Sequence, residues 1–372
     1  MKYLKINTHI NIVFTVVCVL LINSVAHAQD PIFSLQQTSP MNYNPAHVGN
    51  TDFTRAIVGY RNQYPAFSNA FTTYTASFDT YFDKFKSGVG LSVMHDKMAK
   101  IFNETTISGA YSFNLMLSEN TLIRAGLQAS YRFQSQDPGG LIFPDMINSN
   151  GSIIPNPFPY NGWNSGSFDV GAGLALMVGP LKVGASAFNF SGKKRMSHNG
   201  IKLPDPLRLH AYASYDIILT DFSEPEGSIS PVDFGQMSIS PGIQYMQQYG
   251  YQTLNIGAFF KAGSLFIGLH ERQDINFESI TIVLSTGIEI DRFGLGISGD
   301  ISRPGSPSNA LTSSAFEVNL SIKLWENKEC SSSGRSARHR GSGRGFIKSS
   351  GGMRVENSGI DKTRVRRYRC PY

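Results

Sequence analysis

The sequence lacks long apolar runs beyond its first thirty residues. From Gln29 onward, no stretch approaches the ~18 consecutive apolar residues that a membrane-spanning helix requires. Any later membrane crossing must therefore be made of strands. Charged residues are also sparse, at 16% of 372 residues, whereas the chain holds 36 Gly, 25 Phe and 16 Tyr. Together with a mean hydropathy of −0.16, this composition is typical of strands that face lipid on one side and water on the other.

The local signatures of common catalytic and metal sites are missing as well. The sequence contains no HExxH, no paired CxxC, no GxSxG and no Walker-type phosphate loop. We therefore predict that the protein is not an enzyme and binds no cofactor. A barrel hydrolase whose residues come from distant strands would leave no local motif. That class stays open as an alternative, as does a passive pore or transporter.

Cysteine is scarce, with three residues in the chain. Cys18 lies in an N-terminal segment with a charged start, an apolar stretch and small residues before Gln29, the three parts of a signal peptide. We expect residues 1–28 to be removed. Cys330 and Cys370 would then remain in an oxidising compartment, where a disulfide between them is permitted, although the sequence gives no geometry for it.

Alternation with a period of two recurs through residues 29–325. In the segment 122–133, Ile123, Leu127 and Phe133 fall on one face, and Arg124 and Arg132 fall on the other. A helix would also place the two arginines on one face, so this segment alone does not decide the structure. The segment 313–325 repeats the pattern, with Phe, Val, Leu and Ile alternating with Glu, Asn, Ser and Lys. The repetition favours strands with a lipid-facing side and a wet side.

Gly, Pro and Asn/Asp clusters divide this region into about fourteen segments of strand length. We expect an all-β fold, a transmembrane outer-membrane β-barrel of about fourteen antiparallel strands, followed by a basic tail. A soluble β-sandwich is the alternative. The predicted strands are 53–63, 69–79, 87–98, 101–117, 121–135, 165–178, 181–190, 206–219, 236–248, 252–262, 263–271, 277–290, 292–302 and 313–325.

The connections between these strands support the same architecture. Barrels of this class alternate short periplasmic turns with longer outer loops. If the connections are numbered along the chain, the even-numbered ones include tight turns at 178–181, 261–264 and 291–292. The odd-numbered ones include the long loop 136–165, which is rich in Pro, Gly and Asn. The acidic connection 220–235 is a long exception. We predict an outer-membrane location with both termini in the periplasm.

Four motifs in sequence resemble signatures of the PorP/SprF family. They are QDPIFS at 29–34, NPAHVG at 44–49, YRNQY at 60–64 and GLSVMHDK at 90–97. The resemblance implies a non-enzymatic membrane component of the type IX secretion and gliding machinery. It implies partners among the periplasmic lipoprotein ring, the outer-membrane translocon, and secreted or adhesin-like cargo whose export or surface attachment the protein supports. His95, where the family pattern commonly has Asn, is a departure.

The same motifs have plain physical interpretations. Asn44 and Pro45 suit a turn, because Pro fixes φ and Asn can bond to its own backbone. A strand-entry turn is the simpler interpretation and a binding epitope the alternative. Arg61 and Asn62 would close the first strand at the outer rim. There they could contact a partner or simply face solvent.

The tail, residues 326–372, changes abruptly into Ser, Gly and Arg. It carries twelve Lys/Arg and four Asp/Glu, so its net charge of +8 exceeds the formal net charge of +6 for the whole chain. Export makes nucleic acid an improbable partner for such a segment. We predict that the tail docks to an acidic periplasmic partner or to peptidoglycan; the alternative is a solvated extension. The arginines expected to bind are Arg338, Arg340, Arg344, Arg364, Arg366, Arg367 and Arg369.

Overall fold

The structure of the chain is a computed structural model. It describes residues 30–35, 40–51, 53–67, 71–99, 101–137, 142, 146–148, 150–154, 162–192, 194–196, 202–204, 206–221, 236–248, 251–275, 279–304 and 314–326. The chain divides into two compact units, Met1–Ile32 and Phe33–Tyr372, and the second contains the described strands. The predicted signal peptide, the tail beyond Glu326 and both of its cysteines lie outside the described residues.

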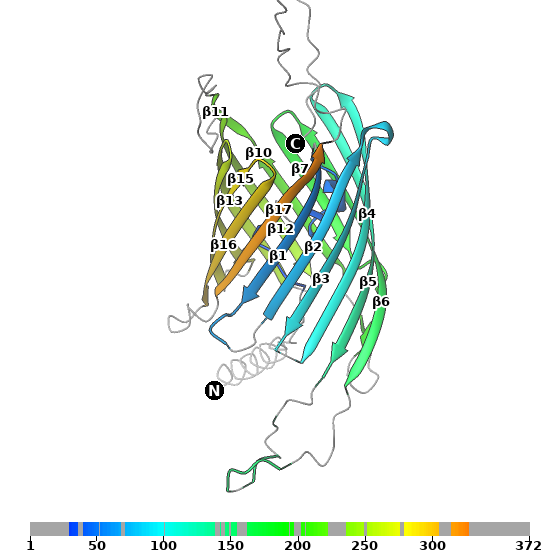
Figure 1. Cartoon of the computed structure of the whole chain (residues 1–372), viewed down its shortest axis with the longest axis vertical. Helices are drawn as coiled ribbons and strands as arrows, with labels where there is room; N and C mark the ends of the chain where they lie inside the picture. Colours follow the sequence, from blue (N-terminus) through cyan, green and yellow to red (C-terminus); the bar gives the residue numbers. More distant parts are fainter. Residues whose placement is uncertain are drawn as a thin grey trace, which may run out of the picture. The chain divides into compact units, whose positions relative to one another are not determined.

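The second unit is built from antiparallel strands that follow one another around a barrel wall (Figure 1). Two of them, β10 (Arg208–Tyr215) and β11 (Ile217–Asp221), both pair with β12, so they are two parts of one wall strand. The described wall therefore has fourteen strands, as the sequence predicts. The others are β1 (Phe53–Gln63), β2 (Phe71–Phe82), β3 (Ser87–Met98), β4 (Phe102–Ser118), β5 (Thr121–Gln136), β6 (Trp163–Val178), β7 (Leu181–Phe188), β12 (Gln236–Gln248), β13 (Tyr251–Ala262), β14 (Leu265–Asp274), β15 (Ser279–Ile290), β16 (Phe293–Pro304) and β17 (Ser314–Glu326).

The sheet closes on itself where the first wall strand meets the last, and the break between β10 and β11 is bridged by their common neighbour β12. β1 pairs with β17 from Phe53↔Glu326 to Gln63↔Ala315, and β10 pairs with β12 from Arg208↔Gln248 to Ser214↔Gly242. Closure satisfies the backbone donors and acceptors that a free edge would leave in hydrocarbon, where each unpaired group costs several kcal/mol. Among the described residues, no helix is both long and apolar enough to cross a membrane.

The predicted faces are confirmed on both strands from which they were inferred. On β17, Phe316 and Leu320 are exposed on the outside, whereas Glu317 and Asn319 are buried on the inside. On β5, Leu127 and Phe133 are exposed and Arg124 is fully buried. The apolar residues thus form the outer surface and the polar residues line the lumen, which is the arrangement of an outer-membrane-type barrel.

The two ends of the barrel differ in their connections. At one end, which we name the short-turn end, the connections 82–87, 118–121, 178–181, 262–265 and 290–293 are brief. At the other, the long-loop end, lie the connection 136–163 and the one between β7 and β10, which contains the small hairpin β8 (Lys194–Met196) and β9 (Lys202–Pro204). Of the exceptional connection 220–235, Thr220 and Asp221 belong to β11, and residues 222–235 lie outside the described residues. β1 begins and β17 finishes at the short-turn end.

We predict that a charge on the outer face destabilises the barrel. Leu284 is 56% exposed in the middle of β15, between Leu269 and Gly299 of the flanking strands. Leu284→Lys should lower the free energy of unfolding in lipid by ~2–4 kcal/mol, because the ammonium group would enter hydrocarbon. Leu284→Met serves as the matched control and should change it by less than ~1.5 kcal/mol. Denaturant titration in vesicles measures both, and equal values would contradict a lipid-facing β15.

Candidate functional site

The lumen is occupied by the chain's own N-terminal residues. We call the described residues 33–35 and 40–51 the plug. They include two short 3-10 turns, η2 (Pro40–Asn42) and η3 (Pro45–His47). Leu35, Met41 and Val48 are at most 3% exposed, although they precede the first wall strand. The plug is therefore packed inside the wall and does not lie outside it.

The central turn of the plug has the local structure that its sequence predicts. The Asn44 side chain accepts a hydrogen bond of 2.9 Å from the Ala46 amide, and Pro45 occupies the first position of η3. The turn is not a strand entry, however. The Asn44 side-chain amide donates to the carbonyls of Leu174 on β6 (3.0 Å) and Ala185 on β7 (3.3 Å). Its buried amide thus attaches the turn to the lumen wall.

Glycines on the lumen face of the wall make room for this turn. A Cβ added to Gly126 would lie 2.2 Å from the Ala46 nitrogen, and one added to Gly173 would lie 2.0 Å from the Asn44 Oδ1. The same holds near the short-turn end, where a Cβ on Gly88 would lie 2.2 Å from the Val48 carbonyl oxygen. Any side chain there would collide with the plug, so these strand glycines permit close approach.

The C-terminal end of the plug is held close to the short-turn end. The Val48 carbonyl accepts from Ser112 Oγ at 2.7 Å and from Arg124 Nη2 at 2.8 Å, and Arg124 Nη1 also donates to the Asn50 side chain. The Gly49 amide donates to Asp79 Oδ2 at 3.0 Å. Arg124 is fully buried. Its contacts to two plug residues give this buried cation hydrogen-bond acceptors that the wall alone does not provide.

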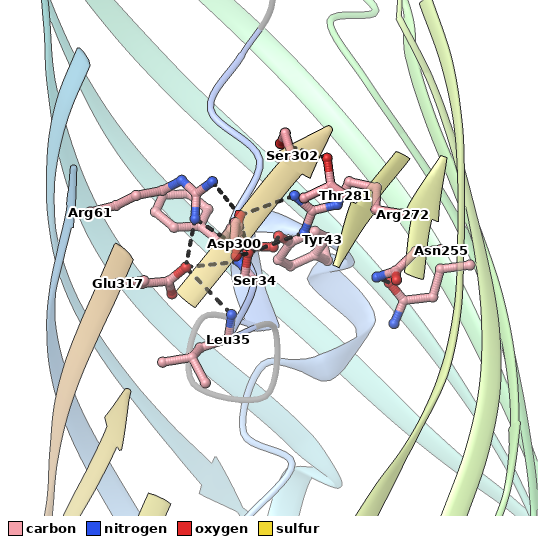
Figure 2. A network of polar contacts seen from close by, with 12 residues as sticks. Ser34, Leu35, Tyr43, Arg61, Asn255, Arg272, Thr281, Asp300, Ser302 and Glu317 are labelled. Atoms are coloured by element: carbon pink, nitrogen blue, oxygen red, sulfur yellow. Dashed lines mark hydrogen bonds and ion pairs between the residues drawn. The ribbon is translucent and has the colours of Figure 1, made fainter. Parts of the chain in front are cut away.

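The N-terminal end of the plug is held by a cluster of four charged wall residues (Figure 2). We name Arg61, Arg272, Asp300 and Glu317 the Asp300 cluster. Asp300 accepts from Ser34 Oγ at 2.6 Å, from Arg61 Nη2 at 2.8 Å and from Arg272 Nη1 at 3.3 Å. Glu317 Oε2 accepts from the Ser34 amide at 2.8 Å and from Arg61 Nη1 at 3.4 Å. The cluster therefore binds both the backbone and the side chain of Ser34.

The charges of the Asp300 cluster balance, with two arginines against two carboxylates. The side chains of Arg61, Asp300 and Glu317 are at most 4% exposed. Desolvation of such charges costs several kcal/mol per ion, which close pairing and additional hydrogen bonds can offset. Loss of one member would leave an uncompensated buried charge.

Burial also affects a histidine in the plug. His47 Nε2 lies 2.7 Å from the hydroxyl of Tyr212 on β10, in hydrogen-bond contact. Burial, followed by the positive charge of Arg124, lowers the pKa of His47 to about 3. A neutral imidazole in this position adds no charge to a region that already holds a buried arginine.

The contacts fix the direction in which the plug crosses the lumen. Ser34 meets Arg61 and Glu317, which lie within four residues of the strand ends at the long-loop end. Val48 meets Arg124, close to the turn that starts β5 at the short-turn end. The chain thus passes from the long-loop end to the short-turn end before it turns back into β1. Ser34 and Glu326 consequently lie toward opposite ends of the barrel, although both termini are predicted on one side.

The predicted site residues have different outcomes. Arg61 is buried in the lumen and belongs to the Asp300 cluster, not to the solvated rim. Asn62 is half-buried and donates to the Tyr60 hydroxyl at 3.4 Å. Contact of these two residues with a partner stays a prediction. The seven tail arginines and the pair Cys330 and Cys370 lie outside the described residues.

The structure also adds site residues that the sequence pattern does not single out: Ser34, Arg124, Asp300 and Glu317. Arg124 and Glu317 were recognised as inward-facing, and a buried charge of this kind requires a partner. That requirement is the signal that could have drawn attention to them. Their partners come from distant parts of the chain and could not be paired by spacing. Within the part of the chain that the structure describes, no group of three or more His, Cys, Asp or Glu side chains could hold a metal ion.

Removal of Arg61 should test the cluster. Arg61→Met leaves two buried carboxylates with Arg272 as their remaining cation, so it should lower the free energy of unfolding by ~3–5 kcal/mol. Adding Glu317→Gln should restore part of the loss. Lys323→Met is the matched control, because Lys323 pairs at 3.2 Å with a half-exposed Glu289 and should cost under ~1 kcal/mol. Denaturant unfolding measures all three, and equal losses for Arg61 and Lys323 would refute the buried network.

Comparison with solved structures finds remote likenesses. The outer membrane protein Omp33 of Acinetobacter baumannii is 11% identical, with 74% of this chain and 100% of that chain covered and a TM-score of 0.40. The toluene transporter TodX of P. putida is 9% identical, with 76% and 93% covered and a TM-score of 0.42. At these identities and scores the likeness carries no functional argument.

Sequence comparison is more specific. No curated protein matches the sequence. A family model described as "Type IX secretion system membrane protein PorP/SprF" matches residues 25–322, which include the plug, the Asp300 cluster and almost the whole barrel. Three of the four motifs noted in the sequence supply residues to these sites: Ser34, the turn at Asn44 and Arg61. The chain therefore belongs to the PorP/SprF family of type IX secretion system membrane proteins.

Proposed function

We propose that the protein is a non-enzymatic outer-membrane component of a type IX secretion machinery, and that it supports export or surface attachment of other proteins by binding them or their partners. The observation that carries this proposal is the family match over residues 25–322. The outer-membrane-type barrel formed by the described strands supports it, because its apolar outer face suits integration into that membrane.

The lumen supports a binding role over a catalytic one. The buried charges next to the plug are engaged with one another or with the plug: Arg61 and Arg272 with Asp300, and Arg124 with the Val48 carbonyl. A general acid or base must reach its substrate to act on it. These groups are covered by the protein's own chain, so partners would meet the protein at its two ends.

We further propose that the long-loop end faces the exterior and the short-turn end faces the periplasm. The asymmetry of the connections supports this orientation, because barrels of this class have short periplasmic turns. It sends the chain beyond Glu326 into the periplasm. There the excess of eight positive charges on residues 326–372 would bind an acidic partner or peptidoglycan, with Arg366 and Arg367 able to contact carboxylates bidentately.

Deletion should separate a secretion role from a general role in the membrane. A clean deletion should abolish surface display of particular cargo proteins and leave assembly of other outer-membrane barrels intact. Complementation with the wild-type chain should restore display, and cell-surface labelling followed by mass spectrometry measures it. Unchanged secretion and motility in the deletion strain would refute the proposal.

Tagged proteins should test the orientation and the tail together. A tag inserted between Ile142 and Ser152 should be labelled on intact cells, and one placed after Tyr372 should be labelled only after permeabilisation.

A chain truncated after Trp325 should still insert into the membrane. It should no longer co-purify with periplasmic components at low salt, where charge-driven binding by the tail is least screened. The reverse labelling would contradict the orientation, and retained partners would reduce the tail to a solvated extension.

A further inference from the structure

We propose that the plug is a removable gate: while docked it closes the lumen to ions and small solutes, and the lumen opens when it leaves the wall. This inference concerns transport through the barrel and does not depend on the secretion role. It rests on three properties of the described contacts, namely their distribution around the wall, their independence from the strand pairing, and the charge balance of the Asp300 cluster, which does not involve the plug.

The first property is that the plug contacts the wall around most of its circumference. Ser34 reaches β1, β14, β16 and β17 through the Asp300 cluster. The turn at Asn44 reaches β6 and β7, and Val48 reaches β4 and β5. Gly49 reaches β2, and the Asn42 carbonyl accepts from Arg208 on β10 at 3.1 Å. A segment that contacts opposite walls of a barrel blocks the passage between them.

The second property is that the wall does not need the plug for its own backbone pairing. The ladder that closes the barrel, β1 with β17, and the ladder of β10 with β12 contain no plug residue. The plug is attached through hydrogen bonds that each involve a side chain, which water in an open lumen can replace, and through the small apolar cluster of Met41 and Val48 with Ala110. It can therefore detach while the closed sheet persists.

The third property is that the Asp300 cluster stays neutral in both states. Arg61 pairs with Asp300 at 2.8 Å and with Glu317 at 3.4 Å, and Arg272 pairs with Asp300 at 3.3 Å. None of these pairs involves the plug. When Ser34 leaves, the cluster loses hydrogen bonds but no charge is left without a partner. The plug can therefore be released from the cluster reversibly.

Two isosteric changes in the plug should move the gate in opposite directions. Asn44→Asp keeps the oxygen that accepts from Ala46, but it loses the donor to Leu174 and Ala185 and buries a negative charge against two carbonyl oxygens. Asn50→Asp makes the same chemical change six residues later, where the Asn50 oxygen accepts from Arg124. There the new charge strengthens the bond. Neither substitution alters a wall residue.

A disulfide can hold the plug in place independently. A Cβ built on Gly90 lies 3.0 Å from Cγ1 of Val48, a separation suited to an S–S bond of ~2.05 Å between cysteines at these positions. The flexible Met41 side chain, 2.9 Å from the same Cβ, would have to move slightly. The pair Val48→Cys and Gly90→Cys, with Cys330→Ser and Cys370→Ser to remove competing thiols, tethers the plug to β3 under oxidation and frees it under reduction.

The experiment is single-channel recording of the purified full-length protein in planar bilayers, with circular dichroism to confirm a folded barrel. The wild type should be closed almost all the time. Asn44→Asp should raise the open time at least ~10-fold, because the substitution removes two hydrogen bonds donated by the amide and places a charge in a buried position. Adding Asn50→Asp should reduce that open time. Oxidation of the cysteine pair in the Asn44→Asp background should abolish the openings, and reduction should restore them.

The alternative outcomes would overturn the proposal. If the oxidised, tethered protein conducts as well as the reduced one, the plug does not close the lumen. If Asn44→Asp is folded but remains as closed as the wild type, the plug is a fixed part of the core. If Asn44→Asp does not assemble, Ser186→Ala replaces it, because this change removes the hydroxyl donor to the Tyr43 carbonyl. The expected rise in open time is then smaller. A folded Ser186→Ala barrel that stays closed would count equally against the gate.

Discussion

The pairing of every backbone group in the wall is the constraint on which the rest of this structure depends. Hydrocarbon offers no hydrogen bonds, so a spanning sheet cannot keep an edge. The first wall strand must therefore meet the last, and the register between Phe53 and Glu326 fixes which side chains face each other at the seam. Arg61 and Glu317 become direct neighbours through that register. The charged cluster in the lumen is thus a consequence of closure.

Closure creates an interior, which must be filled by groups that can form hydrogen bonds with the polar side chains of the wall. Water is one solution, and this chain uses its own N-terminal residues as well. Glycines such as Gly126 and Gly173 let the turn at Asn44 approach the wall, and Arg124 and Asp300 supply hydrogen bonds at its two ends. The lumen and the plug are therefore matched in shape and in hydrogen bonding, as two elements of one folded core.

Most of the wall could be predicted from sequence, because lipid imposes a local rule on every strand. The alternation of Phe316 and Leu320 with Glu317 and Asn319 shows each face directly, and Gly or Pro punctuation marks the ends. The plug could not be predicted in the same way. Its turn at Asn44 was recognised, but its position inside the barrel depends on contacts such as that of Ser34 with Glu317, 283 residues apart. No periodicity encodes such a pairing.

That separation in sequence has a consequence for biogenesis. Ser34 and Arg61 are synthesised early, whereas Asp300 and Glu317 belong to the last two strands, so the cluster forms only when nearly the whole barrel is present. Contacts of such long range form slowly, because loop closure must precede them. In an unfinished barrel Arg61 would have neither carboxylate, and the seam beside it would still be open. Completion of the wall and pairing of Arg61 with its two carboxylates are thus a single late event, which distinguishes a finished barrel from every shorter intermediate.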